Sequence, residues 1–248
     1  MKVRIVSLAI FGMFGASVAL AQAAPTSEVG SFESKVDVQG EVQQTTGGSK
    51  NTQNMDVGSV KNGTVDTTFF SNVEVQGDIK QNINSNGSEN KQNLAVGSVT
   101  DSKVNGSFTA TKITTGAINQ TINSGSLNEQ TANIGSVTGN SDVGSVTIDE
   151  IKVGKITQTI DGGGNNKQYL GVGSVTNSTV VGNFNSKVVT EDITQTTNGK
   201  DNTQDLLLGS AKNAATNSFK SDVKVQGPIT QSVVGNGHKQ GASFGSIR

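Results

Sequence analysis

The sequence predicts an all-β protein, a β-solenoid of six stacked repeats of about 37 residues, each with two strand–turn–strand halves. Three observations carry this prediction. Glutamines recur at a nearly fixed spacing, apolar residues alternate with polar ones, and Val (29) and Ile (15) far outnumber Leu (8). Alternation with a period of two is typical of strands, and β-branched residues favour pleated surfaces. A fixed period of a few tens of residues is typical of solenoids and related repeat folds.

Residues 1–23 are predicted to be a signal peptide of the Gram-negative type. Lys2 and Arg4 form a positively charged start, an apolar run extends over residues 5–20, and alanines at 19, 21 and 23 fit an Ala-x-Ala cleavage site. This run is short for a membrane span, which needs about 20 residues. We therefore expect a secreted protein with no membrane span once the signal is removed, and its net charge falls from −1 to −3.

The repeats are defined by two glutamines and a Gly-Ser pair. Successive first glutamines are spaced by about 37 residues, a second glutamine follows about 10 residues later, and the Gly comes five positions after that. The first glutamines are Gln44, Gln81, Gln120, Gln158, Gln195 and Gln231; the second are Gln53, Gln92, Gln130, Gln168, Gln204 and Gln240; the repeat-junction glycines are Gly58, Gly97, Gly135, Gly173, Gly209 and Gly245.

The first half of each repeat is predicted to be two strands joined by a turn. Ile156, Gln158 and Ile160 share one face of the first strand, and residues 161–166 are Gly, Asn and Asp types that suit a turn. Gln168, Leu170 and Val172 share one face of the return strand. Each strand therefore has one buried face that carries two apolar positions and one glutamine.

The second half begins at Gly-Ser and contains Val-x-Gly-x-Phe or a variant, as in residues 104–108. Residues 24–39 are predicted to be a partial N-terminal repeat, and residues 40–248 the six-repeat domain. Whether each repeat forms one large coil or two smaller ones stays open at this stage.

The twelve glutamines are predicted to form two structural ladders inside the solenoid. Stacked coils place equivalent residues about 4.8 Å apart, where each side-chain amide can donate to one neighbour and accept from the other. The alternative is that these glutamines face solvent and recur only through duplication. The buried ladder is favoured because the outward positions differ between repeats and the glutamines do not.

Composition excludes several function classes. The chain has no Cys and one histidine, His238, which rules out thiolate chemistry and any site with two imidazoles. Its near-balanced charge argues against nucleic-acid binding. The adjacent acids Asp149-Glu150 and Glu191-Asp192 would point to opposite faces of a strand. We therefore expect no enzyme activity, no cofactor and no metal site.

Neither end of the repeat array shows a cap, and the C-terminus is still in repeat register at residues 240–248. Uncapped sheet edges can pair with another chain, and head-to-tail addition that does not close produces a filament. The leading hypothesis is therefore a homopolymer, an extracellular fibre whose subunits stack end to end.

Residues 81–92 and 158–168 carry two glutamines around a Gly/Asn-rich turn, and here the chain resembles the curlin-type secreted functional amyloids. The resemblance covers about half of the mature chain. It implies extracellular assembly, a biofilm matrix or adhesion role, an outer-membrane export pore and a minor nucleator subunit. The sequence departs from that family in its longer period, in its Gly-Ser-Val half and in lacking the regular Ser at the strand start.

Two other classes are alternatives. A monomeric secreted β-solenoid that acts as an adhesin, or binds ice or a polysaccharide, would be favoured by flat outward rows of threonine. Thr157, Thr194 and Thr230 align, but Gln43, Lys80 and Asn119 interrupt the row. An outer-membrane β-barrel needs strands of about 9–11 residues and aromatic girdles, whereas the predicted strands are short and aromatic residues make up 4%.

Overall fold

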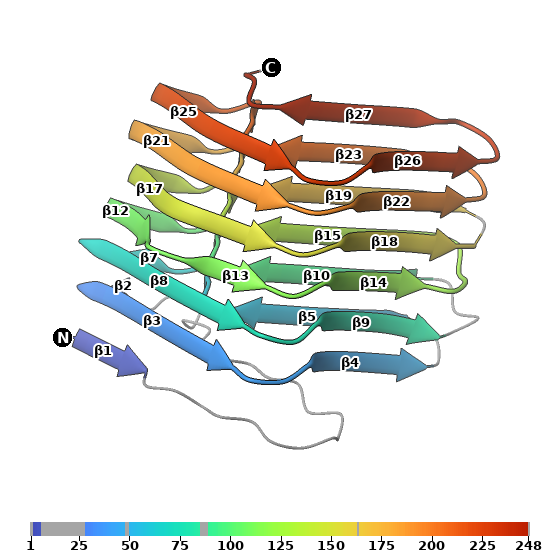
Figure 1. Ribbon diagram of the computed structural model, residues 1–248, viewed down its shortest axis with the longest axis horizontal. Helices are drawn as coiled ribbons and strands as arrows, with labels where there is room; N and C mark the ends of the chain where they lie inside the picture. Colours follow the sequence, from blue (N-terminus) through green and yellow to red (C-terminus); the bar gives the residue numbers. More distant parts are fainter. Residues whose placement is uncertain (1, 6–27, 48–49, 85–88, 163, 248) are drawn as a thin grey trace.

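The computed structural model describes residues 2–5, 28–47, 50–84, 89–162 and 164–247. It confirms the predicted fold class, because the described residues form an all-β solenoid of parallel stacked sheets without a helix (Figure 1). Of the predicted signal peptide, only residues 2–5 lie within this part of the chain.

Four parallel sheets make up the described part of the solenoid, and we name them A to D. Sheet C contains β4 (Val42–Gly47), β9 (Ile79–Asn84), β14 (Ile118–Ile122), β18 (Ile156–Asp161), β22 (Ile193–Asn198) and β26 (Ile229–Val234). Sheet B contains β5 (Asn51–Val57), β10 (Glu89–Val96), β15 (Leu127–Ile134), β19 (Asn165–Val172), β23 (Thr203–Leu208) and β27 (Lys239–Phe244).

The second half of each repeat supplies sheets D and A. Sheet D contains the two-residue strands β6 (Val60–Lys61), β11 (Val99–Thr100), β16 (Val137–Thr138), β20 (Val175–Thr176) and β24 (Ala211–Lys212). Sheet A contains β1 (Lys2–Ile5), β2 (Glu28–Val29), β3 (Ser31–Val38), β7 (Thr64–Val65), β8 (Thr68–Val75), β12 (Lys103–Ala110), β13 (Ile113–Thr115), β17 (Asp142–Val153), β21 (Thr179–Thr190) and β25 (Ala215–Val225).

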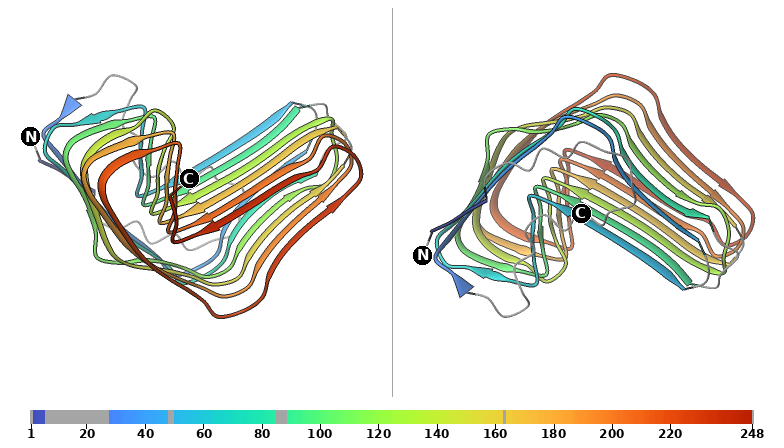
Figure 2. Two further views of the ribbon diagram at one scale, coloured as in Figure 1. Left: turned by 90° about the horizontal axis from the view of Figure 1, so that it is seen from above. Right: turned by 90° about the horizontal axis from the view of Figure 1, so that it is seen from below.

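Each repeat forms one large coil, which settles the alternative that the sequence left open. The chain passes from sheet C to B, D and A, and then rises to sheet C of the next coil (Figure 1). The register shows this directly: Gln92 lies opposite Gln53 on one side and Gln130 on the other. Seen along the stack, every coil has the same bent outline, so equivalent side chains form columns (Figure 2).

Two kinds of corner shape the coil. At the Gly-Ser pair, the glycines take left-handed φ values between 49° and 59°. A Cβ on Gly97 would lie 2.7 Å from Ile113 Cδ1, so this corner needs glycine both for its backbone and for its close packing. The turn after sheet D also uses left-handed residues, at Asn62, Asp101 and Asn177, which are the types that tolerate this conformation.

The core runs through the whole stack. Ile79, Leu94 and Val96 are at most 1% exposed, and Ile113 from sheet A closes the same cluster. Each coil alone buries few apolar side chains, so stability arises mainly between neighbouring coils.

Candidate assembly site

The first set of glutamines forms a continuous ladder along sheet C. In every step, Nε2 of one coil donates to Oε1 of the coil on its N-terminal side. The distances are 3.0 Å (Gln81 to Gln44), 2.8 Å (Gln120 to Gln81), 2.7 Å (Gln158 to Gln120), 2.8 Å (Gln195 to Gln158) and 2.8 Å (Gln231 to Gln195).

The second set forms a parallel ladder along sheet B with the same direction of donation. The distances are 3.1 Å (Gln92 to Gln53), 3.0 Å (Gln130 to Gln92), 3.0 Å (Gln168 to Gln130), 2.9 Å (Gln204 to Gln168) and 3.1 Å (Gln240 to Gln204). The structure therefore brings all twelve predicted glutamines together.

Each ladder also links sheet B to sheet C. Gln120 Nε2 donates to the Thr131 carbonyl at 3.1 Å, and Gln130 Nε2 donates to the Thr159 carbonyl at 2.9 Å. Gln120 and Gln130 are both 0% exposed. Their two N–H groups and their side-chain oxygens are thus satisfied without water, which is what allows an amide to be buried at little cost.

A third ladder was missed in the sequence. In five of the coils the residue two positions before the second glutamine is an asparagine, and these asparagine side chains stack on one another. In each step Nδ2 donates to the asparagine of the next coil toward the C-terminus. The distances are 3.3 Å (Asn51 to Asn90), 3.2 Å (Asn90 to Asn128), 3.1 Å (Asn128 to Asn166) and 3.0 Å (Asn166 to Asn202). The recurring Asn-x-Gln triplet was the available signal, and His238 takes the sixth position.

The predicted junction glycines lie at the corners between sheets B and D, and the serine after each forms a further column. The Ser98 N–H donates to Ser59 Oγ at 3.0 Å, and the Ser136 N–H donates to Ser98 Oγ at 3.2 Å. Each hydroxyl in turn donates to the carbonyl two residues earlier, as Ser98 does to Val96 at 3.0 Å. The Gly-Ser pair is therefore both a turn and a contact between coils.

Aromatic rings stack in sheet A. The ring centroids of Phe32 and Phe69 are 5.4 Å apart, those of Phe69 and Phe108 are 4.9 Å apart, and those of Phe184 and Phe219 are 4.9 Å apart. Val146 interrupts the column in the fourth coil. The column reaches the last coil, where Phe219 is only partly buried.

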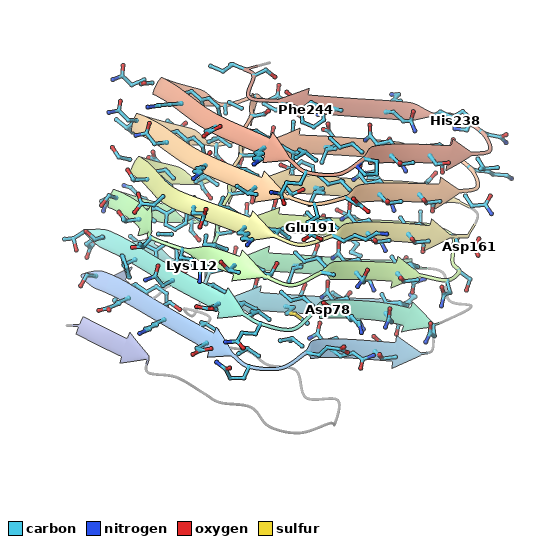
Figure 3. The ribbon with its side chains drawn as sticks, in the orientation of Figure 1. Asp78, Lys112, Asp161, Glu191, His238 and Phe244 are labelled. Carbon is cyan, nitrogen blue, oxygen red and sulfur yellow. The ribbon has the colours of Figure 1, made fainter. Side chains whose placement is uncertain are left out.

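The C-terminal end of the stack is an open cross-section. Ile229 and Phe244 are 38% and 43% exposed, whereas Ile193 and Leu208, at the same positions one coil below, are 0% exposed. Phe244 lies on the terminal strand β27 (Figure 3). Within the described residues, neither Gln231 Oε1 nor Gln240 Oε1 accepts a hydrogen bond. This end therefore offers both apolar surface and unused acceptors.

Charged side chains on the outer faces form ion pairs between coils. Lys80 Nζ lies 2.6 Å from Glu41 Oε2, and this hydrogen bond raises the pKa of Lys80. The Asp56 carboxyl, which lies on the outer face of sheet B, has its pKa raised by burial, against the opposing effect of Lys61. Solvent screens exposed pairs such as Lys80 with Glu41, so they add little to stability.

Among the described residues, the acidic residues and the histidine that could act in catalysis or metal binding do not form a cluster. Asp161, Glu191 and His238 are in different coils, and Glu191 lies at another corner than Asp161 and His238 (Figure 3). In the part of the chain that the structure describes, no three His, Asp or Glu side chains group so as to hold a metal ion. No helix long and apolar enough to span a membrane occurs among these residues.

Comparison with known proteins gives no relative. No protein-family model, no curated protein and no solved structure matches the chain.

Proposed function

We propose that the chain is a secreted structural subunit that assembles end to end, by β-stacking, into an extracellular amyloid-like fibre. The observation that carries the proposal is the exposed C-terminal cross-section of the described residues, where Ile229 and Phe244 are 38% and 43% exposed and two glutamine ladders reach the last described strands. A further coil placed there would continue each of these columns.

The direction of the ladders supports the same conclusion. Every Gln Nε2 donates toward the N-terminal side, so Gln231 and Gln240 present acceptors at one end. The N-terminal coil presents Gln44 and Gln53. Gln44 Nε2 donates to the Asn54 carbonyl at 3.0 Å. Gln53 Nε2 donates to Thr46 Oγ1 at 2.6 Å and to the Asn82 carbonyl at 3.0 Å, so it would exchange the bond to Thr46 for one to an acceptor of the next copy. Addition of a second copy in the same orientation matches donors with acceptors, and a repeated heterologous contact produces an open filament.

The resemblance to curlin-type functional amyloids supports a role in a biofilm matrix or in surface adhesion. Under this proposal the partners are other copies of the chain, a minor nucleator subunit and an outer-membrane export pore. No catalytic activity or cofactor is part of it.

Sedimentation and electron microscopy of the exported protein test this function. The protein is refolded from denaturant, concentrated, and followed over days. We expect unbranched fibres in the pellet and a fixed concentration of monomer in the supernatant. A folded monomer that stays in solution at every concentration would contradict the proposal.

A second candidate function is a monomeric adhesin or a binder of ice or polysaccharide. It is favoured by a second outward row on sheet C, next to the row that Gln43, Lys80 and Asn119 interrupt. The second row consists of Thr45, Asn82, Thr121, Thr159, Thr196 and Ser232. A stable monomer that causes thermal hysteresis, or that is retained on a polysaccharide matrix, would favour this candidate.

A further inference from the structure

The first and last long strands of sheet A carry matching sequences. Residues 32–38 of β3 read Phe-Glu-Ser-Lys-Val-Asp-Val, and residues 219–225 of β25 read Phe-Lys-Ser-Asp-Val-Lys-Val. The inward residues are identical, and the three charged residues between them are opposite in sign.

The register of the stack makes these two segments equivalent. Phe32 lies opposite Phe69 in the next coil, and the same column continues to Phe219. The column that begins at Val38 likewise ends at Val225. A copy added in register at the C-terminal end would therefore place its Phe32 over Phe219.

We propose that copies join in one specific register, with β25 of one copy paired in parallel to β3 of the next, and that three matched charge pairs select this contact. The inference rests on the proposed end-to-end assembly and names its interface. The pairs are Lys220 with Glu33, Asp222 with Lys35, and Lys224 with Asp37.

The geometry of the stack brings these charges close together. Equivalent residues on neighbouring strands are about 4.8 Å apart, a distance at which opposite charges on an exposed surface attract. The same sheet already contains such contacts, since Lys187 Nζ lies 3.8 Å from Glu150 Oε1 and Lys112 Nζ lies 3.3 Å from Glu74 Oε2. Three of the inner coils carry one charge each in this segment, Glu74, Lys112 and Lys187, whereas β17 carries Asp149, Glu150 and Lys152.

The inner face of the contact is matched as well. Phe219 over Phe32 would extend a column whose ring centroids lie 4.9–5.4 Å apart within the chain. Gln44 of the added copy would donate to Gln231 Oε1, as in every internal step of that ladder. Gln53 would exchange its bond to Thr46 Oγ1 for one to Gln240 Oε1.

The charge pattern also opposes pairing between like ends. If two β25 strands paired antiparallel about Asp222, each Lys220 would face a Lys224 and the two aspartates would face each other. Two β3 strands centred on Lys35 would place Glu33 against Asp37 and lysine against lysine. Like charges directly opposite destabilise a strand pair, so closed dimers in these two registers are disfavoured.

The N-terminal edge is partly covered in the full chain. β1 pairs with β3 over Ser31–Ser34, and β1 lies in the segment that we predict to be removed during export. The experiment therefore uses the exported form of the protein, in which β3 is the edge strand.

Charge reversal with cross-rescue tests the interface. Variant 1 carries Lys220→Glu, Asp222→Lys and Lys224→Asp, and variant 2 carries Glu33→Lys, Lys35→Asp and Asp37→Lys. A third chain carries all six changes. The control carries Lys103→Glu, Asp142→Lys and Lys152→Asp, three exposed positions away from both ends with the same charge change as variant 1. The readout is the monomer concentration that remains after assembly.

We expect variants 1 and 2 each to leave about tenfold or more monomer than the wild type, because attraction becomes repulsion at three positions. A one-to-one mixture of variants 1 and 2, and the six-change chain alone, should both return to the wild-type level, as should the control. Recovery in the mixture also shows that both variants fold.

If the wild type forms fibres and variant 1 or variant 2 assembles as well as the wild type, the proposed interface is wrong while the fibre function stands. The same conclusion follows if neither the mixture nor the six-change chain returns to the wild-type monomer concentration. Absence of fibres from the wild type would instead contradict the proposed function itself.

Discussion

A buried glutamine in this solenoid has every hydrogen-bonding group satisfied because the coils above and below carry the same residue. Gln130 Nε2 donates to Gln92 Oε1 at 3.0 Å and to the Thr159 carbonyl at 2.9 Å, while Gln168 donates to Gln130. Removing one amide therefore leaves polar groups in two neighbouring coils and in the facing sheet without partners. The ladder makes each glutamine depend on its neighbours.

Replacing Gln130 with Ala should lower the free energy of unfolding by about 2–4 kcal/mol, because the change leaves a cavity and strands buried donors and acceptors. Gln43→Ala is the matched control, since that side chain is exposed on the outer face of sheet C, and it should change stability by less than about 0.5 kcal/mol. Urea unfolding of the monomer measures both. Equal effects would contradict a structural role for the ladder.

Asp56 provides a pH-dependent test at the same scale. Burial raises its pKa in the folded state, so its ionised form weakens the fold as pH rises through the folded-state pKa. Asp56→Asn should therefore stabilise the protein at neutral pH. The difference should vanish at a pH well below the unfolded-state pKa of about 3.9, where the carboxyl is protonated in both states. Unfolding curves at several pH values check this, and a constant difference would contradict it.

At the scale of the element, the Gly-Ser corner decides how the chain leaves sheet B. Gly97 has φ of 52°, and an added Cβ would lie 2.7 Å from Ile113 Cδ1. Gly40, between sheets A and C, has no atom within 4 Å of such a Cβ and no left-handed φ. Two glycines at different corners of the solenoid therefore have different requirements.

Gly97→Ala should destabilise the monomer by about 1–2 kcal/mol or more, because a left-handed backbone and a steric clash add together. Gly40→Ala should be neutral or slightly stabilising, since alanine reduces the freedom of the unfolded chain. Thermal unfolding of the two variants side by side measures the difference. A larger effect at Gly40 would contradict the assignment of the corner.

The two glutamine ladders could be predicted from the sequence because inward-facing positions of a strand are usually apolar. A glutamine at such a position is conspicuous, and its recurrence in every repeat indicated two ladders. Asn90 and its equivalents are not conspicuous, because they adjoin turns that are rich in Asn and Gly. The number of coils per repeat could not be predicted either, since alternation identifies a strand and not the strand that it pairs with.

At the scale of the whole molecule, the two ends matter most. The match between residues 32–38 and 219–225 appears only when the register defines which residues stack. The C-terminal end exposes Ile229 and Phe244, whose equivalents one coil below are fully buried. The stack therefore has a direction, with different surfaces at its two ends.

Phe244→Lys should leave the stability of the monomer nearly unchanged, because Phe244 is already 43% exposed. It should slow fibre elongation about tenfold or more, since a buried unpaired charge would lie inside each new contact. Val181→Lys is the control: Val181 is 67% exposed on β21, away from both ends. Growth from wild-type seeds measures the rates, and equal rates for the two variants would contradict end-to-end growth.

X-ray diffraction from aligned fibres of the exported protein tests the central claim most directly. Because the strands stack along the direction of growth, the account predicts a strong meridional reflection at about 4.8 Å. Fibres that lack this reflection, or that show it on the equator, would contradict end-to-end stacking of the coils.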